Sequence, residues 1–224
     1  MLEFKNITHC DRRIFERTFL NEIVLLFAYE KVDPSSLDEE FHSFLSQEGC
    51  RDITTGDKGC VYNYQDAVIT VSSAGTLVSI PSKEYKDFET SGEIWCHVER
   101  LFKQICINPT AWAFTKGNRF VFNKPISSEQ YDAAFQLILS HDLLACTKEN
   151  HLCAISSNDA TSLFVAKYGL EQISGKDSLS LKIFISSMSY NLDGLREQVF
   201  ERNKDMFNCW MWCMSEKMIS FMSK

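Results

Sequence analysis

The sequence predicts an α+β fold: two strand-helix-three-strand-helix units forming a mostly antiparallel curved sheet backed by helices, with a long C-terminal helix. Short β-branched and aromatic segments separated by turn residues indicate the strands, and apolar residues spaced three and four apart indicate the helices. The same order of elements occurs twice in 224 residues. We therefore predict one compact pseudo-duplicated domain, with halves at residues 1–108 and 109–224.

The first half is predicted from apolar segments and the residues that interrupt them. Asp33-Pro34 ends an apolar segment, and Pro34 with the two following serines opens a helix that stops before Gly49. Ser73-Ala74-Gly75 fits a hairpin turn. The predicted elements are a strand at 19–32, a helix at 37–47, strands at 61–64, 68–72 and 76–80, and a helix at 93–107.

The second half repeats this order. Ser127-Ser128-Glu129 provides a helix start, and the last helix begins at Leu192. The predicted elements are a strand at 112–122, a helix at 127–144, strands at 152–155, 162–170 and 179–186, and the C-terminal helix. In topology alone, this order resembles the helix-backed curved sheet of the TATA-binding-protein fold.

Charge and cysteine content restrict the classes of partner and the compartment. The formal net charge is −7, and the closest basic clusters are Arg12-Arg13 and Lys116 with Arg119, which argues against direct nucleic-acid binding. Nine cysteines, odd in number and irregularly spaced, favour reduced thiols. There is no charged-then-apolar leader and no apolar run of about 18 residues, so we expect a cytoplasmic protein without a membrane segment.

The sequence offers no recognisable catalytic or metal centre. Cys209 and Cys213 lie one helical turn apart, but tetrahedral zinc would need two further ligands. Cys60 follows the loop at 56–59 without a histidine beside it in the sequence, so a cysteine that opens a strand is the favoured interpretation. Gly-x-Ser-x-Gly and a phosphate-binding loop are both missing. We predict no catalytic residues, no metal and no cofactor, and hence a non-enzymatic protein.

The segment 206–214 (MFNCWMWCM) carries the main functional hypothesis. At 100° per residue most of its large side chains share one broad helical arc, while Trp212 projects opposite and Met211 lies at the edge. Aromatic residues and Met are enriched in interface cores. We predict that Trp212, Met211, Cys209 and Trp210 bind another protein or a second copy of the chain. The alternative is that they fill a groove within the chain.

A second hypothesis places a small-ligand or nucleotide site between sheet and helices. Strand alternation over residues 116–123 puts Arg119, Val121 and Asn123 on one face. Arg119 and Asn123 would then provide the polar contacts of a sensor cavity. They are equally consistent with the solvent side of an amphipathic strand.

The order of these segments resembles that of a sporadically distributed, functionally uncharacterised family of bacterial proteins known by a serial-number label. The matching segments are 21–29, 85–88, 117–125 and 192–222. Arg119 and Asn123 lie one residue farther apart than the family pattern, and 206–214 is unusually rich in Met and Trp. The resemblance implies an architecture, a bacterial origin and no catalytic residues. It further implies an accessory component of a toxin–antitoxin or antiphage-defence system whose partner is encoded by a neighbouring gene.

Overall fold

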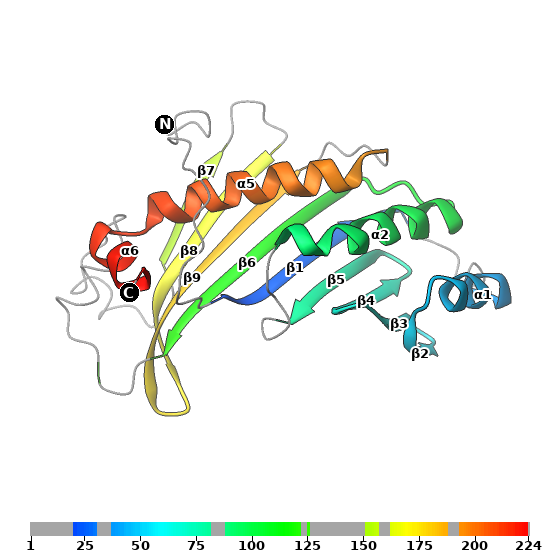
Figure 1. Cartoon of the computed structure of the whole chain (residues 1–224), viewed down its shortest axis with the longest axis horizontal. Helices are drawn as coiled ribbons and strands as arrows, with labels where there is room; N and C mark the ends of the chain where they lie inside the picture. Colours follow the sequence, from blue (N-terminus) through cyan, green and yellow to red (C-terminus); the bar gives the residue numbers. More distant parts are fainter. Residues whose placement is uncertain are drawn as a thin grey trace. The chain divides into compact units, whose positions relative to one another are not determined.

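The computed structural model describes residues 20–30, 37–81, 88–121, 125, 151–156, 162–187 and 193–223. They form an α+β fold, as predicted (Figure 1). The strands are β1 (Leu20–Ala28), β2 (Arg51–Gly56), β3 (Gly59–Tyr64), β4 (Ala67–Ser72), β5 (Gly75–Pro81), β6 (Ala111–Val121), β7 (His151–Ser156), β8 (Ser162–Ile173) and β9 (Lys176–Ser187). The helices are α1 (Glu39–Gln47), η3 (Phe88–Ser91), α2 (Gly92–Gln104), α5 (Leu195–Cys213) and α6 (Glu216–Met222).

The chain divides into two compact units that do not follow the predicted halves. Unit 1 comprises Met1–Asn21, Thr115–Ile185 and Lys204–Lys224, and unit 2 comprises Glu22–Phe114 and Ser186–Asn203. In unit 2 the strand order is β2-β3-β4-β5-β1, with the beginning of β6 beside β1. In unit 1 the rest of β6 is followed by β9, β8 and β7. The pairs β1–β5, β2–β3, β3–β4, β4–β5 and β7–β8 are all antiparallel, which confirms the predicted sheet type.

The first predicted helix exists, but its start is corrected. Asp38 is the N-cap, and its carboxylate accepts hydrogen bonds from the backbone N–H groups of Glu40 and Phe41 at 3.0 and 3.1 Å. A carboxylate at this position satisfies N–H groups that have no partner within the helix, so α1 begins at Glu39 and not at the Pro34 signal. Gly49, with φ of +78°, follows the end of α1 in the left-handed conformation that glycine adopts without strain.

The predicted three-strand meander of the first half is wrong in number, because four strands follow α1. The additional strand, β2, is polar and mostly exposed, so it lacks the apolar alternation that predicts a strand. Its register on β3 shifts between Arg51 and Thr54, and Asp52 has a φ of +55°. Such a bulge is common on an edge strand, where it hinders pairing with a further chain.

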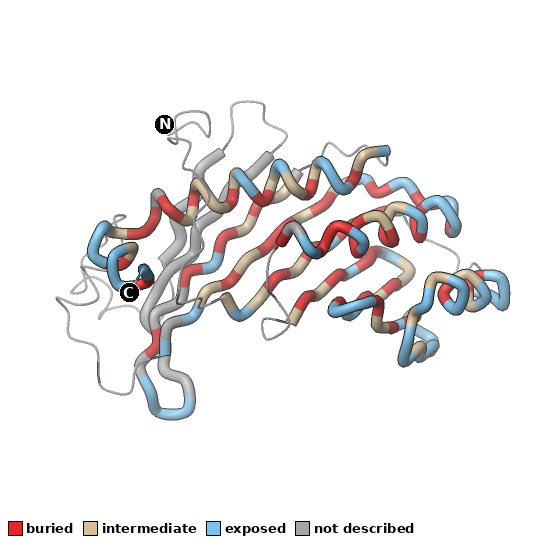
Figure 2. Tube along the Cα trace, in the orientation of Figure 1, coloured by how far each residue is buried: buried red, intermediate tan, exposed pale blue. Residues whose placement is uncertain are grey.

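The core of unit 2 lies between the sheet and α2. Ile23, Leu25 and Phe27 alternate along β1 as fully buried residues, which Figure 2 shows as red bands along the strand. The Phe27 ring meets Phe102 of α2 edge-on at 5.2 Å and stacks on Trp112 of β6 at 6.3 Å. Burying each such aromatic side chain contributes about 2 to 3 kcal/mol. The helix ends at Gln104, three residues before the predicted boundary, and Cys106 then turns with a φ of +52°.

The C-terminal helix is divided, which corrects the prediction of one continuous helix. Met214 and Ser215 separate α5 from α6. Ser215 is extended, with φ of −72° and ψ of 157°, and its hydroxyl accepts a hydrogen bond from the Met218 backbone N–H at 3.1 Å. This is N-cap geometry, and it starts a new helix inside an apolar segment.

The predicted helix at 127–144 lies outside the described residues, whereas the three strands that follow it are present as β7, β8 and β9. Among the described helices none is long and apolar enough to cross a bilayer. Even the longest, α5, carries both acidic and basic side chains along its length.

Candidate functional site

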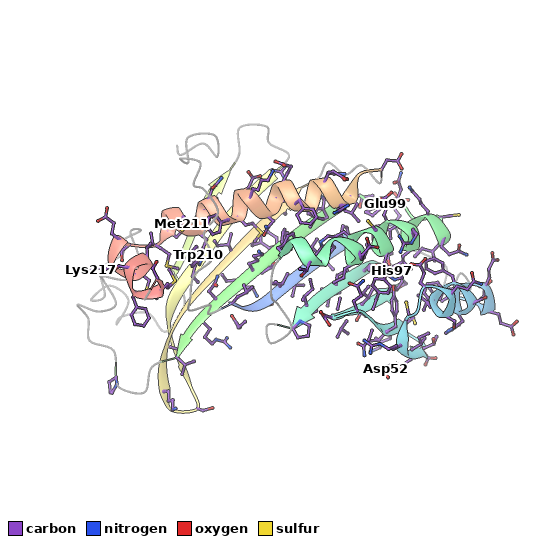
Figure 3. All side chains as sticks on the ribbon, in the orientation of Figure 1. Asp52, His97, Glu99, Trp210, Met211 and Lys217 are labelled. Carbon is purple, nitrogen blue, oxygen red and sulfur yellow. The ribbon has the colours of Figure 1, made fainter. Side chains whose placement is uncertain are left out.

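A buried histidine on α2 connects three elements of unit 2. His97, labelled in Figure 3, is completely buried, and its Nδ1 lies 3.0 Å from Oε2 of Glu48, the residue after α1. Its Nε2 lies 3.0 Å from the hydroxyl of Tyr62 on β3. Both ring nitrogens therefore have a polar partner, as burial requires.

The surroundings hold the imidazole ring and its carboxylate partner in place. Tyr64 stacks on the ring at 4.0 Å, and Phe44 stacks at 5.9 Å. The Arg100 guanidinium donates to both oxygens of Glu48, with Nε at 3.0 Å from each and Nη2 at 2.6 Å from Oε2. Fork-like arginine–carboxylate pairs are the strongest side-chain hydrogen bonds in proteins. We refer to Glu48, Tyr62, His97 and Arg100 as the His97 network.

The pKa shifts assign a proton to each group of the network. Burial lowers the pKa of His97 despite its bond to Glu48, so the ring is neutral at pH 7. The Arg100 hydrogen bond lowers the pKa of Glu48, which is therefore ionised. Burial raises the pKa of Tyr62, which keeps its hydroxyl proton. We therefore assign the hydrogen to Nδ1, which donates to Glu48, while Nε2 accepts from Tyr62.

Cys50 makes this arrangement resemble a catalytic triad. Its sulfur lies 3.8 Å from Nε2, on the side of the ring opposite the carboxylate, which is the order of nucleophile, base and orienting acid. Two facts oppose that chemistry. Burial, with Glu48 and Cys60 nearby, raises the pKa of the Cys50 thiol to about 12, and Tyr62 lies closer to the same nitrogen. His97 is thus already hydrogen-bonded, and the thiol is not activated.

Sequence reasoning missed the His97 network because its contacts connect distant positions. His97 and Glu48 are 49 residues apart, and His97 and Tyr62 are 35 apart. In the sequence, Cys60 is the cysteine that follows an exposed-looking loop. In the structure, Cys50 is the thiol that approaches a histidine. No group of three metal-ligating residues occurs in the described part of the chain. Glu48 and Cys50 approach opposite nitrogens of His97 and so do not converge on one point.

The predicted partner-binding residues of the last helices lie in unit 1. Cys209 and Met211 are buried, and Trp210 is half-buried with its ring 6.0 Å from Phe207. The partner-binding hypothesis for these residues stays a prediction. The Trp212 side chain lies outside the described part of the structure.

The residues of the predicted ligand site are not brought together in the described structure. Arg119 is exposed near the end of β6. Asn123 lies outside the described residues, so the sensor hypothesis stays a prediction.

The most unusual surface of unit 2 is the sheet face opposite α2, which we call the open face. Three rows of outward positions cross its strands. The large-residue row runs through successive partners on five strands: Leu26, Leu77, Thr70, Val61 and Thr54. To one side lies the small-residue row of Ala28, Gly75, Ser72, Gly59 and Gly56, and to the other the mixed row of Val24, Ser79, Val68 and Asn63.

The large-residue and small-residue rows are uncharged, whereas Arg51 of β2 extends the mixed row opposite Asn63. The largest aliphatic side chains of the three rows are exposed, at 45% for Leu26, 40% for Val61, 37% for Leu77 and 36% for Val68. An antiparallel sheet with one solvated face normally alternates apolar residues inside with polar residues outside. The open face departs from that alternation, which marks it as a candidate binding surface.

Comparison with known proteins does not assign a function to this surface. No protein-family model matches the chain, and neither does any curated protein. The resemblance to the serial-numbered bacterial family therefore stays a prediction, and the function has to be argued from the geometry.

Proposed function

We propose that the protein is a non-enzymatic interaction module that binds another protein chain through the open face of unit 2. The observation that carries this proposal is the continuous row Leu26–Leu77–Thr70–Val61–Thr54, which is uncharged and has exposed aliphatic side chains on three strands. Binding would remove these side chains from water at about 25 cal/mol per Å² of apolar surface.

The size of the open face supports this role. Five strands about 4.8 Å apart, and three rows about 7 Å apart, cover on the order of 500 Å². The largest apolar patches of monomeric proteins measure about 300–600 Å² and are often functional. Depletion of charged residues is also characteristic of interface cores.

This proposal moves the interface away from the last helices. Cys209 and Met211 are buried and offer little surface to a partner. The two partner hypotheses drawn from the sequence are unchanged. The bacterial family resemblance favours an effector encoded by a neighbouring gene, and self-association is the other possibility. The role in antiphage defence or a toxin–antitoxin pair rests on that resemblance alone.

The chemistry of the His97 network supports the non-enzymatic part of the proposal. Nucleophilic catalysis requires a free base beside an accessible nucleophile. His97 is fully buried and accepts the Tyr62 hydrogen bond, and the Cys50 thiol stays protonated. We assign the network to the stability of unit 2.

Affinity purification of the tagged chain from cells of the organism that encodes it tests the proposal. We expect Leu77→Glu to abolish recovery of the proteins that the unmodified chain captures. The matched control is Val121→Glu, because Val121 is a 50% exposed strand residue in unit 1 and lies outside the open face. Equal recovery by the two variants, with both folded, would contradict the open face as the binding surface.

A further inference from the structure

We infer that His97 is an acid-sensitive latch: when its ring takes up a second proton, α1 and the residues up to Cys50 detach from α2 and β3, while the rest of unit 2 stays folded. This inference concerns the buried network and not the open face, so it does not depend on the proposed function. Three features support it: the attachment of α1, the hydrogen bonds of the imidazole ring, and the charges around that ring.

Helix α1 is short and is attached to unit 2 by few buried side chains. It has nine residues, and its buried residues are Phe41 and Leu45. An isolated helix of this length is marginal in water, so α1 depends on contacts with other elements. It lies at the β2 edge of unit 2 (Figure 1), where the His42 ring is 3.1 Å from the Thr55 hydroxyl. Loss of its contacts with α2 would leave it weakly held.

The contacts between the end of α1 and α2 converge on the His97 ring. Phe44 stacks on the ring at 5.9 Å, Glu48 accepts from Nδ1 at 3.0 Å, and the Cys50 sulfur lies 3.8 Å from Nε2. Arg100, three residues further along α2, donates to the same carboxylate. A change in the charge of this one ring therefore acts on the whole segment from Phe44 to Cys50.

The hydrogen bonds of the ring suit a neutral imidazole and not an imidazolium. Nδ1 donates to Glu48, which leaves Nε2 to accept from the Tyr62 hydroxyl. An imidazolium carries a second N–H at Nε2, so the hydroxyl would have to turn and accept from it. The hydroxyl hydrogen would then point into buried surroundings, where the thiols of Cys50 and Cys60 are weak acceptors. Protonation thus exchanges a good hydrogen bond for a poorly satisfied donor.

The charges around the ring also oppose a further positive charge. Glu48 is the anion that faces His97, and the Arg100 guanidinium already neutralises it. The titratable groups near the ring on β3 and after α1 keep their protons because burial raises the pKa of each: Tyr62, Tyr64, Cys60 and Cys50. An imidazolium would therefore leave one uncompensated positive charge on a completely buried side chain. In agreement, burial lowers the pKa of His97.

Of the three elements around the ring, α1 is the one that can detach. The strand β3 is paired with strands on both sides. Helix α2 is anchored by fully buried side chains: Trp95, Val98, Leu101 and Phe102. Weakly attached elements open locally while the rest of a protein stays folded. Movement of α1 and Glu48 away from the ring admits water, which solvates the imidazolium.

Detachment creates an apolar surface that is covered at neutral pH. Phe41, Phe44 and Leu45 share one side of α1 at helical spacing, and this side becomes accessible when the segment opens. In the open form His97 regains its ordinary pKa of 6.5, above its pKa in the closed form. The open form therefore binds the proton more tightly, and opening is favoured as pH falls below 6.5.

Hydrogen–deuterium exchange of the full chain at about pH 7.5 and about pH 5, corrected for the intrinsic pH dependence of exchange, tests the inference. We expect the opening equilibrium constant of residues 39–50 to rise at least about fivefold at the lower pH, while β4 and β5 keep their protection. His97→Gln should remove this response, because the amide does not titrate. His42→Gln is the matched control and should retain it.

Three outcomes would overturn the inference: unchanged protection of residues 39–50 at the lower pH, an equal loss of protection in β4 and β5, or a pH response that His97→Gln retains. If His97→Gln fails to fold, an NMR titration of the unmodified chain replaces it. The His97 ring should then take up its proton together with changes in the amide signals of residues 39–50, and protonation without those changes would contradict the latch. The affinity purification is scored separately, so either proposal can fail while the other stands.

Discussion

Each face of the unit 2 sheet contains one departure from the usual distribution of polar and apolar groups. The inward face is mainly aliphatic and aromatic, but the Tyr62 hydroxyl on β3 is fully buried there against the His97 imidazole of α2, whereas the outward face exposes Leu26 and Leu77. A buried polar group and an exposed apolar patch are each informative, because neither is expected from burial preference alone. The buried polar groups are hydrogen-bonded to one another, so a structural role is sufficient to explain their burial. The exposed aliphatic side chains of the outward face take part in no such network in the described structure, and we propose that they bind a partner.

The largest effect that tests this comparison is expected from His97→Ala. The substitution removes one hydrogen-bond partner from Glu48, which keeps Arg100, removes the partner of the Tyr62 hydroxyl, and creates a cavity beside the rings of Tyr64 and Phe44. We expect the free energy of unfolding to fall by about 3 to 5 kcal/mol, measured by urea denaturation. His42→Ala is the matched control, since His42 is half-exposed on α1, and it should cost less than about 1 kcal/mol. If His97→Ala and His42→Ala lowered the free energy of unfolding equally, the buried histidine would have no special role in stability.

The second prediction concerns the dependence of stability on pH. The pKa of His97 is lowered from 6.5 in the folded chain, so the unfolded chain takes up the proton first as pH falls. The stabilisation is complete above pH 6.5 and is lost as pH falls through the folded pKa, with a slope approaching about 1.4 kcal/mol per pH unit. Glu48, whose pKa is also lowered, adds a further loss below its ordinary value of 4.5.

Urea titrations between pH 8 and pH 5 measure this slope. His97→Gln should make the slope between pH 6.5 and pH 5 shallower, because the unfolded chain then has no imidazole at this position to take up the proton. If His97→Gln kept the full slope, another titrating group would be responsible for the pH dependence.

The third prediction separates a structural network from a catalytic triad. Because the pKa of the Cys50 thiol is raised to about 12, native-state alkylation at pH 8 should modify Cys50 at least about 100-fold more slowly than exposed Cys106, as followed by peptide mass spectrometry. Cys50→Ala should lower the free energy of unfolding by less than about 1.5 kcal/mol, since Tyr62 retains its bond to Nε2. Preferential alkylation of Cys50 would instead support the interpretation of Cys50 as a nucleophile.

Much of the fold could be predicted from the sequence, because local signals agree with tertiary packing in most elements. The turn at 73–75 and the alternation in β3 to β5 are examples. The polar strand β2 has no apolar pattern, because an exposed edge strand needs no apolar residues. The break between α5 and α6 is hidden in the sequence because Met214, Met218 and Met222 keep helical spacing across it. In both places the information lies in contacts with other segments.

The candidate surfaces could not be predicted for a related reason. In β4, Val68, Ile69, Thr70 and Val71 make both faces of the strand apolar or β-branched. Sequence alternation alone therefore does not indicate which face packs on α2 and which stays open. The His97 network depends on α1, β3 and α2 coming together, and the sequence separations of its members hide that contact.

The smallest effect on stability is expected from substitutions on the open face. Leu26→Ser and Leu77→Thr each replace an exposed aliphatic side chain on the open face, where less internal packing is lost than at a core position. We expect the free energy of unfolding of the monomer, measured by urea denaturation at low micromolar concentration, to change by less than about 0.5 kcal/mol. By contrast, Leu25→Ser, one position along the same strand but fully buried, should cost more than about 3 kcal/mol. A large loss at the outward positions would mean that these side chains stabilise the chain itself, and the argument for an interface would then fail. A small loss in the same variants that lose partner binding would instead show that this row of aliphatic side chains serves association and not folding.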